Sequence, residues 1–141
     1  WRFLTGPRMA EDEFQALAAL ADETTIVKRF ETNFQERLDG CALSISQAGY
    51  NTVMNLLRAE ARAVVVPYDE GEETEQWFRS ERMGKMGLLS VVPTSRLSAE
   101  TMAAAVTEAW QREAGARPAI DLEGAANAAA TIAAMAGGAA E

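Results

Sequence analysis

The chain has 141 residues, of which 48% are hydrophobic and 24% are charged, a composition typical of a globular protein with a sizeable core. Its net charge of −8 argues against a nucleic-acid-binding surface, which requires clustered Lys and Arg. The absence of histidine and the single cysteine, Cys41, argue against a zinc or haem site, a catalytic histidine and an internal disulfide. We expect one domain over residues 1–141, located in the cytoplasm because no signal peptide or membrane-spanning run is visible.

Short strands and helices alternate along the chain. Apolar and β-branched runs predict strands at residues 1–4, 24–30, 43–46, 63–66 and 88–92. Helical patterns and capping signals predict helices that begin near residues 11, 34, 51, 74, 98 and 121. Gly87 is expected to end the helix before it, and Ser98 is expected to cap the helix after it. This alternation predicts an α/β fold, a Rossmann-like open parallel sheet with helices on both faces.

The central stretch, residues 43–67, predicts a strand, a glycine turn, a helix and a second strand. Gly49 is able to adopt a positive φ in the turn, and Asn51 or Thr52 is expected to cap the helix. The continuous run of Ala63 and three valines predicts a strand covered on both faces, which Pro67 ends. A glycine turn that leads into a helix above a parallel sheet is a natural seat for a phosphate.

The ligand crevice of an open parallel sheet lies outside the carboxyl ends of its strands. In this sequence those ends carry residues 5–8, 30–33, 47–52 and 68–76. We therefore expect any ligand-binding residues to come from these four segments.

Three motifs in this region resemble the C-terminal half of family 28 glycosyltransferases. They are the turn Ser46-Gln47-Ala48-Gly49-Tyr50-Asn51-Thr52, the strand that ends in Pro67-Tyr68, and the helix that opens with Glu75-Gln76. The family's pattern is a Ser-x-x-Gly-x-x-Thr turn, a strand that ends in Pro-Phe, and an acidic or glutamine-rich helix start. The resemblance extends from residue 1 to about residue 136. It implies one half of a two-domain GT-B enzyme, so we expect the chain to be a fragment without its N-terminal acceptor domain.

The resemblance also implies a ligand, a nucleotide-diphosphate sugar that is usually a UDP-sugar. The implied diphosphate contacts are Gly49, Tyr50, Asn51 and Thr52, with Arg8 in the first turn as a substitute contact. The implied base and ribose contacts are Phe30, Glu31 and Asn55, and the implied sugar contacts are Glu75 and Gln76. Three features depart from the family. The first turn lacks a glycine-rich run, Asn55 replaces a glutamate, and Gly71 is an insertion.

The chemistry expected of this half is binding of the donor, without a metal or other cofactor. The resemblance places the general base in the N-terminal half, so we expect the chain alone to be inactive. Two alternatives stay open: a standalone donor-binding subunit that acts with a separate partner chain, and a sugar-nucleotide epimerase related to GT-B enzymes. The acidic run at residues 69–73 is expected to be a solvated loop. Surfaces that would meet the absent half are expected to make the fragment self-associate, and the full-length form is expected at the inner face of the membrane.

Overall fold

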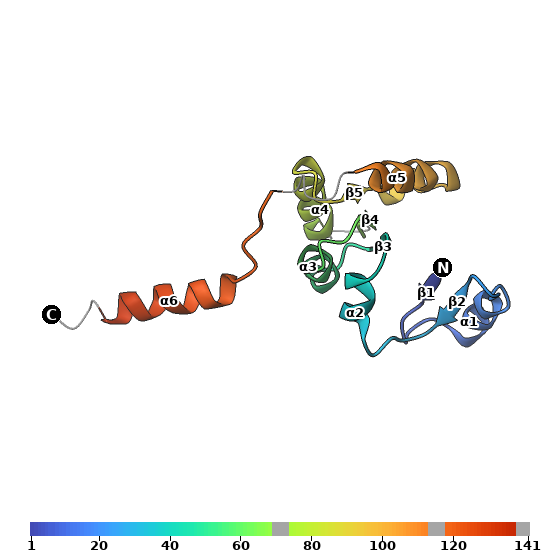
Figure 1. Cartoon of the computed structure of the whole chain (residues 1–141), viewed down its shortest axis with the longest axis horizontal. Helices are drawn as coiled ribbons and strands as arrows, with labels where there is room; N and C mark the ends of the chain where they lie inside the picture. The colour runs from blue at the N-terminus through green and yellow to red at the C-terminus, as the bar shows by residue number, and fades with distance from the viewer. Residues whose placement is uncertain (69–73, 113–117, 138–141) are drawn as a thin grey trace. The chain divides into compact units, whose positions relative to one another are not determined.

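The computed structural model of the chain describes residues 1–68, 74–112 and 118–137 (Figure 1). The acidic run at residues 69–73, which was expected to be a solvated loop, lies outside the described residues. Contacts between residues divide the chain into two compact units, Trp1–Arg37 and Leu38–Glu141.

The first unit is a βαβ arrangement with two parallel strands. β1 (Arg2–Leu4) pairs with β2 (Ile26–Lys28), and α1 (Glu11–Ala18) lies between them in sequence. The Arg29 guanidinium donates to the Met9 carbonyl over 2.8 Å and lies 4.1 Å from the centre of the Phe14 ring. Arg29, which follows β2, is thereby tied to α1 and to Met9 before that helix, and its guanidinium also pairs with the Glu11 carboxylate in the first turn of α1.

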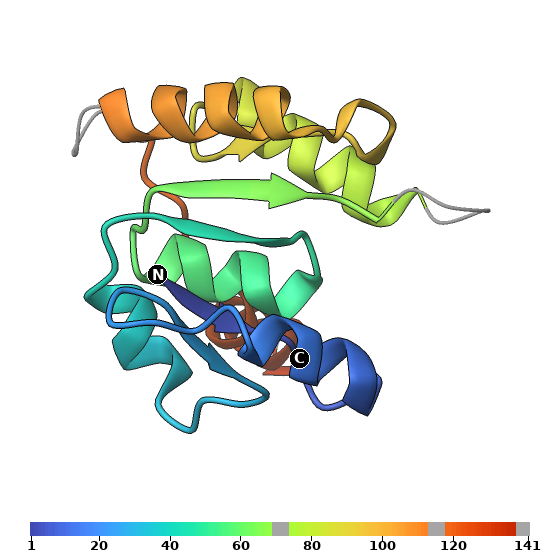
Figure 2. The same cartoon turned by 90° about the vertical axis from the view of Figure 1, so that its right-hand side faces the viewer.

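The second unit contains a three-stranded parallel sheet in the order β3-β4-β5. Its strands are β3 (Ser44–Gln47), β4 (Ala63–Val66) and β5 (Ser90–Val91). The helices that follow them are α3 (Tyr50–Arg58), α4 (Glu75–Lys85) and α5 (Ala99–Gln111), with a short 3₁₀ helix, η1 (Thr94–Arg96), before α5. α2 (Phe34–Asp39) spans the boundary between the two units. Figure 2 shows α3 on one side of β4 and α5 on the other.

The core of the second unit is built around β4. Ala63, Val64 and Val65 have no exposed surface, as the continuous apolar run predicts for a strand covered on both faces. The other large contributions come from α3, the end of β5 and α5: Val53, Leu56, Val92, Ala105 and Ala109. This core fixes the positions of β4 and α3, whose ends carry the residues singled out in the sequence.

The α/β class with parallel strands is confirmed. The described strands fall into two sheets, one in each unit, where a single open sheet was expected. Every strand pair in the described residues is parallel, because each connection between paired strands contains a helix. The expectation of a single domain stays a prediction.

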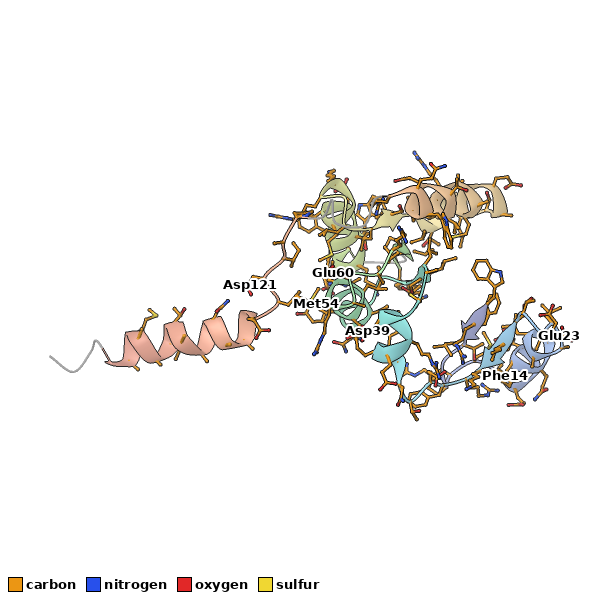
Figure 3. The ribbon with its side chains drawn as sticks, in the orientation of Figure 1. Phe14, Glu23, Asp39, Met54, Glu60 and Asp121 are labelled. Atoms are coloured by element: carbon orange, nitrogen blue, oxygen red, sulfur yellow. The ribbon has the colours of Figure 1, made fainter. Side chains whose placement is uncertain are left out.

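α4 and α3 each end at a residue in the left-handed conformation. Gly87 has a φ of 73° after α4, and the Leu88 amide donates to the Met83 carbonyl over 3.1 Å, which closes the helix as predicted. α3 ends in the same way, but the residue in the left-handed conformation is Glu60, with a φ of 49° (Figure 3). A side chain in this conformation costs roughly 1–2 kcal/mol relative to glycine.

α6 (Gly124–Gly137) is the last element, and its described side chains are all exposed. Ile132 and Met135 are 66% and 73% exposed. Among the described segments, α6 and the other helices are all too short or too polar to cross a membrane.

Ser98→Ala should lower the free energy of unfolding by about 1 kcal/mol, because Ser98 caps α5 as predicted. Its hydroxyl accepts the Thr101 amide over 3.2 Å, and the Thr101 hydroxyl accepts the Ser98 amide over 2.9 Å. The Ser98 hydroxyl also donates to the Glu100 carboxylate, which lowers the pKa of Glu100. This lowered pKa stabilises the fold above the unfolded-state pKa, and the contribution is lost as the pH falls through the folded-state pKa.

Urea unfolding at neutral pH measures the stability loss, and an NMR titration should show the Glu100 pKa rising in the Ser98→Ala variant. Ser95→Ala in η1 is the matched control, since Ser95 is exposed and caps no α-helix. Equal losses in the two variants would contradict the capping role.

Candidate functional site

The turn between β3 and α3 presents backbone amides to solvent. Gly49 is the N-cap of α3, with φ −57° and ψ 145°, so the helix begins at Tyr50. The first helical hydrogen bond runs from the Val53 amide to the Gly49 carbonyl over 3.0 Å. The amides of the three preceding helical residues therefore have no acceptor within α3, and the N-cap, a glycine, has no side chain to cap them.

This geometry corrects two expectations. Asn51 and Thr52 are the second and third residues of the helix, so the prediction that one of them is its N-cap was wrong. Gly49 also has a negative φ and not the positive φ that a glycine allows, and its extended ψ leads the chain directly into the helix. A Cβ atom at Gly49 would meet only Thr52 Oγ1, at 3.9 Å. Neither backbone conformation nor packing within the described residues requires a glycine here, and its absent side chain leaves the amides uncovered.

The electrostatics at this turn favour an anion. The start of a helix carries a partial positive charge, and exposed amides add direct hydrogen-bond donors. The first turn of α3 holds no acidic residue, whereas the first turn of α1 holds Glu11, Asp12 and Glu13. Although the chain has a net charge of −8, the first turn of α3 carries no carboxylate.

Side-chain hydrogen bonds join the residues after β4 to the start of α4 and to η1. Gln76 Oε1 accepts the Tyr68 amide over 3.2 Å, and the Thr94 hydroxyl donates to the Pro67 carbonyl over 2.9 Å. The side-chain oxygen of Gln76 is thus engaged by the backbone, which fixes the start of α4 against the end of β4.

Arg79 connects α4 to the glycine turn. Its Nη2 donates to the Ala48 carbonyl over 2.9 Å, and its Nη1 is paired with the Glu75 carboxylate. Its guanidinium carbon lies 5.4 Å from the centre of the Tyr50 ring. Only 12% of the Arg79 side chain is exposed, compared with 67% for Glu75. The Arg79 guanidinium therefore contacts Ala48, Tyr50 and Glu75. Tyr50 is a predicted diphosphate contact, Glu75 is a predicted sugar contact, and Ala48 precedes the predicted diphosphate contacts.

The remaining predicted contacts divide between the units. Asn55 lies on α3, one turn after Asn51, and is half-buried. Arg8 and Phe30 lie in the first unit with exposed side chains. The Glu31 carboxylate, also in the first unit, is only 8% exposed. It is held by three cations, Arg2 at 2.9 Å, Arg37 at 3.6 Å and Lys28 at 3.7 Å. This burial gives the Glu31 side chain a structural role, and the prediction that its backbone contacts a base stays a prediction.

A sequence profile described as the C-terminal domain of glycosyltransferase family 28 matches residues 2–132. The chain belongs to this family. A relative from Rhodospirillum centenum (strain ATCC 51521 / SW) is 31% identical over 90 residues. That relative is the UDP-N-acetylglucosamine--N-acetylmuramyl-(pentapeptide) pyrophosphoryl-undecaprenol N-acetylglucosamine transferase. The match covers 64% of this chain and 24% of the relative, so the chain spans about a quarter of that protein's length.

Arg79 contacts the candidate site of this family 28 domain, but the sequence analysis did not identify it as a site residue. Its spacing of four residues from Glu75 is typical of an exposed helix pair. Its second partner, Ala48, lies 31 residues away in sequence, so no local pattern indicates the contact. The Ser-x-x-Gly-x-x-Thr turn, by contrast, did predict the position of the amides at the start of α3 that have no acceptor within the helix.

The family 28 domain also has a hollow away from this turn. The hollow, of about 540 Å³, is lined by residues that include Leu57, Glu60, Arg62 and Leu88, near the C-terminal end of α3. None of the predicted contacts lines it. Within the described ranges, no cluster of three or more acidic or Cys side chains is placed to hold a metal ion.

Proposed function

We propose that the chain is the donor-binding half of a two-domain glycosyltransferase that transfers a hexosyl group from a UDP-sugar to an acceptor hydroxyl. The observation that carries the proposal is the start of α3, where three amides without helical acceptors lie beside an uncovered Gly49. Membership of family 28 supports this assignment of the turn. The name of the relative from Rhodospirillum centenum includes a UDP-linked sugar, which supports UDP as the nucleotide.

The chain's contribution to the reaction is to bind the diphosphate and stabilise it as it leaves. When the bond between the sugar's anomeric carbon and the diphosphate oxygen breaks, its electron pair stays on that oxygen. We assign the stabilisation of this charge to the amides of Tyr50, Asn51 and Thr52 and to the dipole of α3, which begins at Tyr50. This role needs no metal ion or other cofactor.

The acceptor hydroxyl loses its proton as its oxygen bonds to the anomeric carbon. We assign the base that takes this proton to the N-terminal domain or a partner subunit, as the resemblance to family 28 implies. The chain alone should therefore bind donor and transfer no sugar.

Titration of the ¹⁵N-labelled chain with UDP should shift amide resonances from Gly49 to Asn55 and around Gln76. Uridine, which lacks the diphosphate, should leave the Gly49, Tyr50 and Asn51 amides nearly unchanged. The diphosphates of adenosine, guanosine and thymidine test the choice of base. No shift with any diphosphate, or shifts confined to the hollow near Glu60, would overturn the proposal.

A further inference from the structure

We propose that Arg79 is a positioning residue for the donor site, one that orients the Gly49 amide and keeps the Thr52 amide available to the diphosphate. The inference rests on the proposed function, because it concerns the same turn. It is carried by the hydrogen bond from Arg79 Nη2 to the Ala48 carbonyl, 2.9 Å long.

The peptide between Ala48 and Gly49 is held from one side by Arg79. A trans peptide is planar, and its C=O and N–H groups point in opposite directions. The guanidinium that fixes the Ala48 carbonyl therefore also fixes the direction of the Gly49 amide. The Ala48 amide is fixed as well, because it donates to the Val66 carbonyl over 3.3 Å. Ala48 itself is fully buried, so this segment is anchored on both sides.

The same contact affects the Thr52 amide. In a helix extended by one residue at its start, the Thr52 amide would donate to the Ala48 carbonyl. No such backbone bond is formed in the described residues, where the bond nearest the helix start runs from Val53 to Gly49. Arg79 takes the Ala48 carbonyl instead, and the Thr52 amide keeps its donor for a ligand.

The geometry requires an arginine. The Nη2 atom contacts Ala48 while the Nη1 atom contacts Glu75, and the planar group lies 5.4 Å from the centre of the Tyr50 ring. A lysine has one compact ammonium group and cannot reproduce this fork. The Arg79 Nε atom is buried and has no hydrogen-bond partner among the described residues, a cost that an ordinary surface pair does not carry.

The test compares Arg79→Met and Arg79→Lys with a matched control, Arg82→Met, on the exposed side of the same helix. Calorimetry should show UDP binding weakened tenfold or more by both Arg79 variants and unchanged by Arg82→Met. Uridine affinity should stay the same in all variants, which a general loss of structure would not allow. In the protein without ligand, the amide shifts of Gly49 and Thr52 should change in both Arg79 variants.

Full UDP affinity in Arg79→Lys would overturn the inference, because positive charge alone would then suffice. Unchanged Gly49 and Thr52 shifts in the Arg79 variants would overturn it too. If Arg79→Met does not fold, Arg79→Lys carries the same test. Failure of the unsubstituted chain to bind UDP would instead refute the proposed function, while the shifts without ligand would still decide whether Arg79 orients the turn.

Discussion

Gly49→Asp should make the protein more stable and at the same time abolish UDP binding. An aspartate at the N-cap accepts hydrogen bonds from the amides of the second and third helical residues. In α3 these are the amides of Asn51 and Thr52, which we assign to the diphosphate. The carboxylate should add a few tenths to about 1 kcal/mol to the free energy of unfolding. The loss of two hydrogen bonds to a charged ligand, at roughly 1.5–3 kcal/mol each, should weaken UDP binding by at least about 100-fold.

Urea unfolding and calorimetric titration with UDP measure these two effects on the same samples. Gly124→Asp is the matched control, because Gly124 is the first residue of α6 and a Cβ there meets nothing within 4 Å. It makes the same change in composition and charge at the start of another helix. A stability gain in Gly49→Asp with unchanged UDP affinity would place the anion elsewhere.

Leu56→Ala should lower the free energy of unfolding by about 2–5 kcal/mol, because Leu56 is 2% exposed and its removal leaves a cavity between α3 and the sheet. A loss of this size is a large part of the roughly 5–15 kcal/mol that stabilises a typical domain. Urea unfolding at constant pH is the measurement.

Leu97→Ala deletes the same atoms at a position that is 50% exposed. Its effect should stay within about 0.5 kcal/mol, as for most surface substitutions. A loss below about 1 kcal/mol in Leu56→Ala would show that α3 is less firmly packed than its burial indicates.

The sequence was most informative where one local pattern decides the structure. The valines of β4 have one favourable environment, a strand buried on both faces, and Ser98 forms the predicted cap of α5. The strand at residues 88–92 was also expected, but regular pairing covers only Ser90–Val91. Ends of strands depend on their partners, which the local composition does not specify.

The candidate site was predicted in position but not in detail. The glycine turn was identified, yet a glycine serves equally at positive φ and at an N-cap, so the pattern could not fix the first residue of α3. Arg79 was missed because its partner Ala48 is distant in sequence and becomes a neighbour only when α4 packs beside the turn. The assignments of Arg8, Phe30 and Glu31 depend on the resemblance alone, and they stay predictions.

The exposed last helix, α6, has a thermodynamic consequence. Isolated helices shorter than about 12–15 residues are marginal in water even when rich in alanine. α6 has 14 residues, with no acidic residue in its first turn and no basic residue in its last to complement its dipole. Its length falls in this range, so α6 should be marginally stable by itself, with Ile132 and Met135 left in water. Any association that buried these two side chains would also have to offset the entropy lost when the helix becomes ordered, and it would be weaker than its contact area alone suggests.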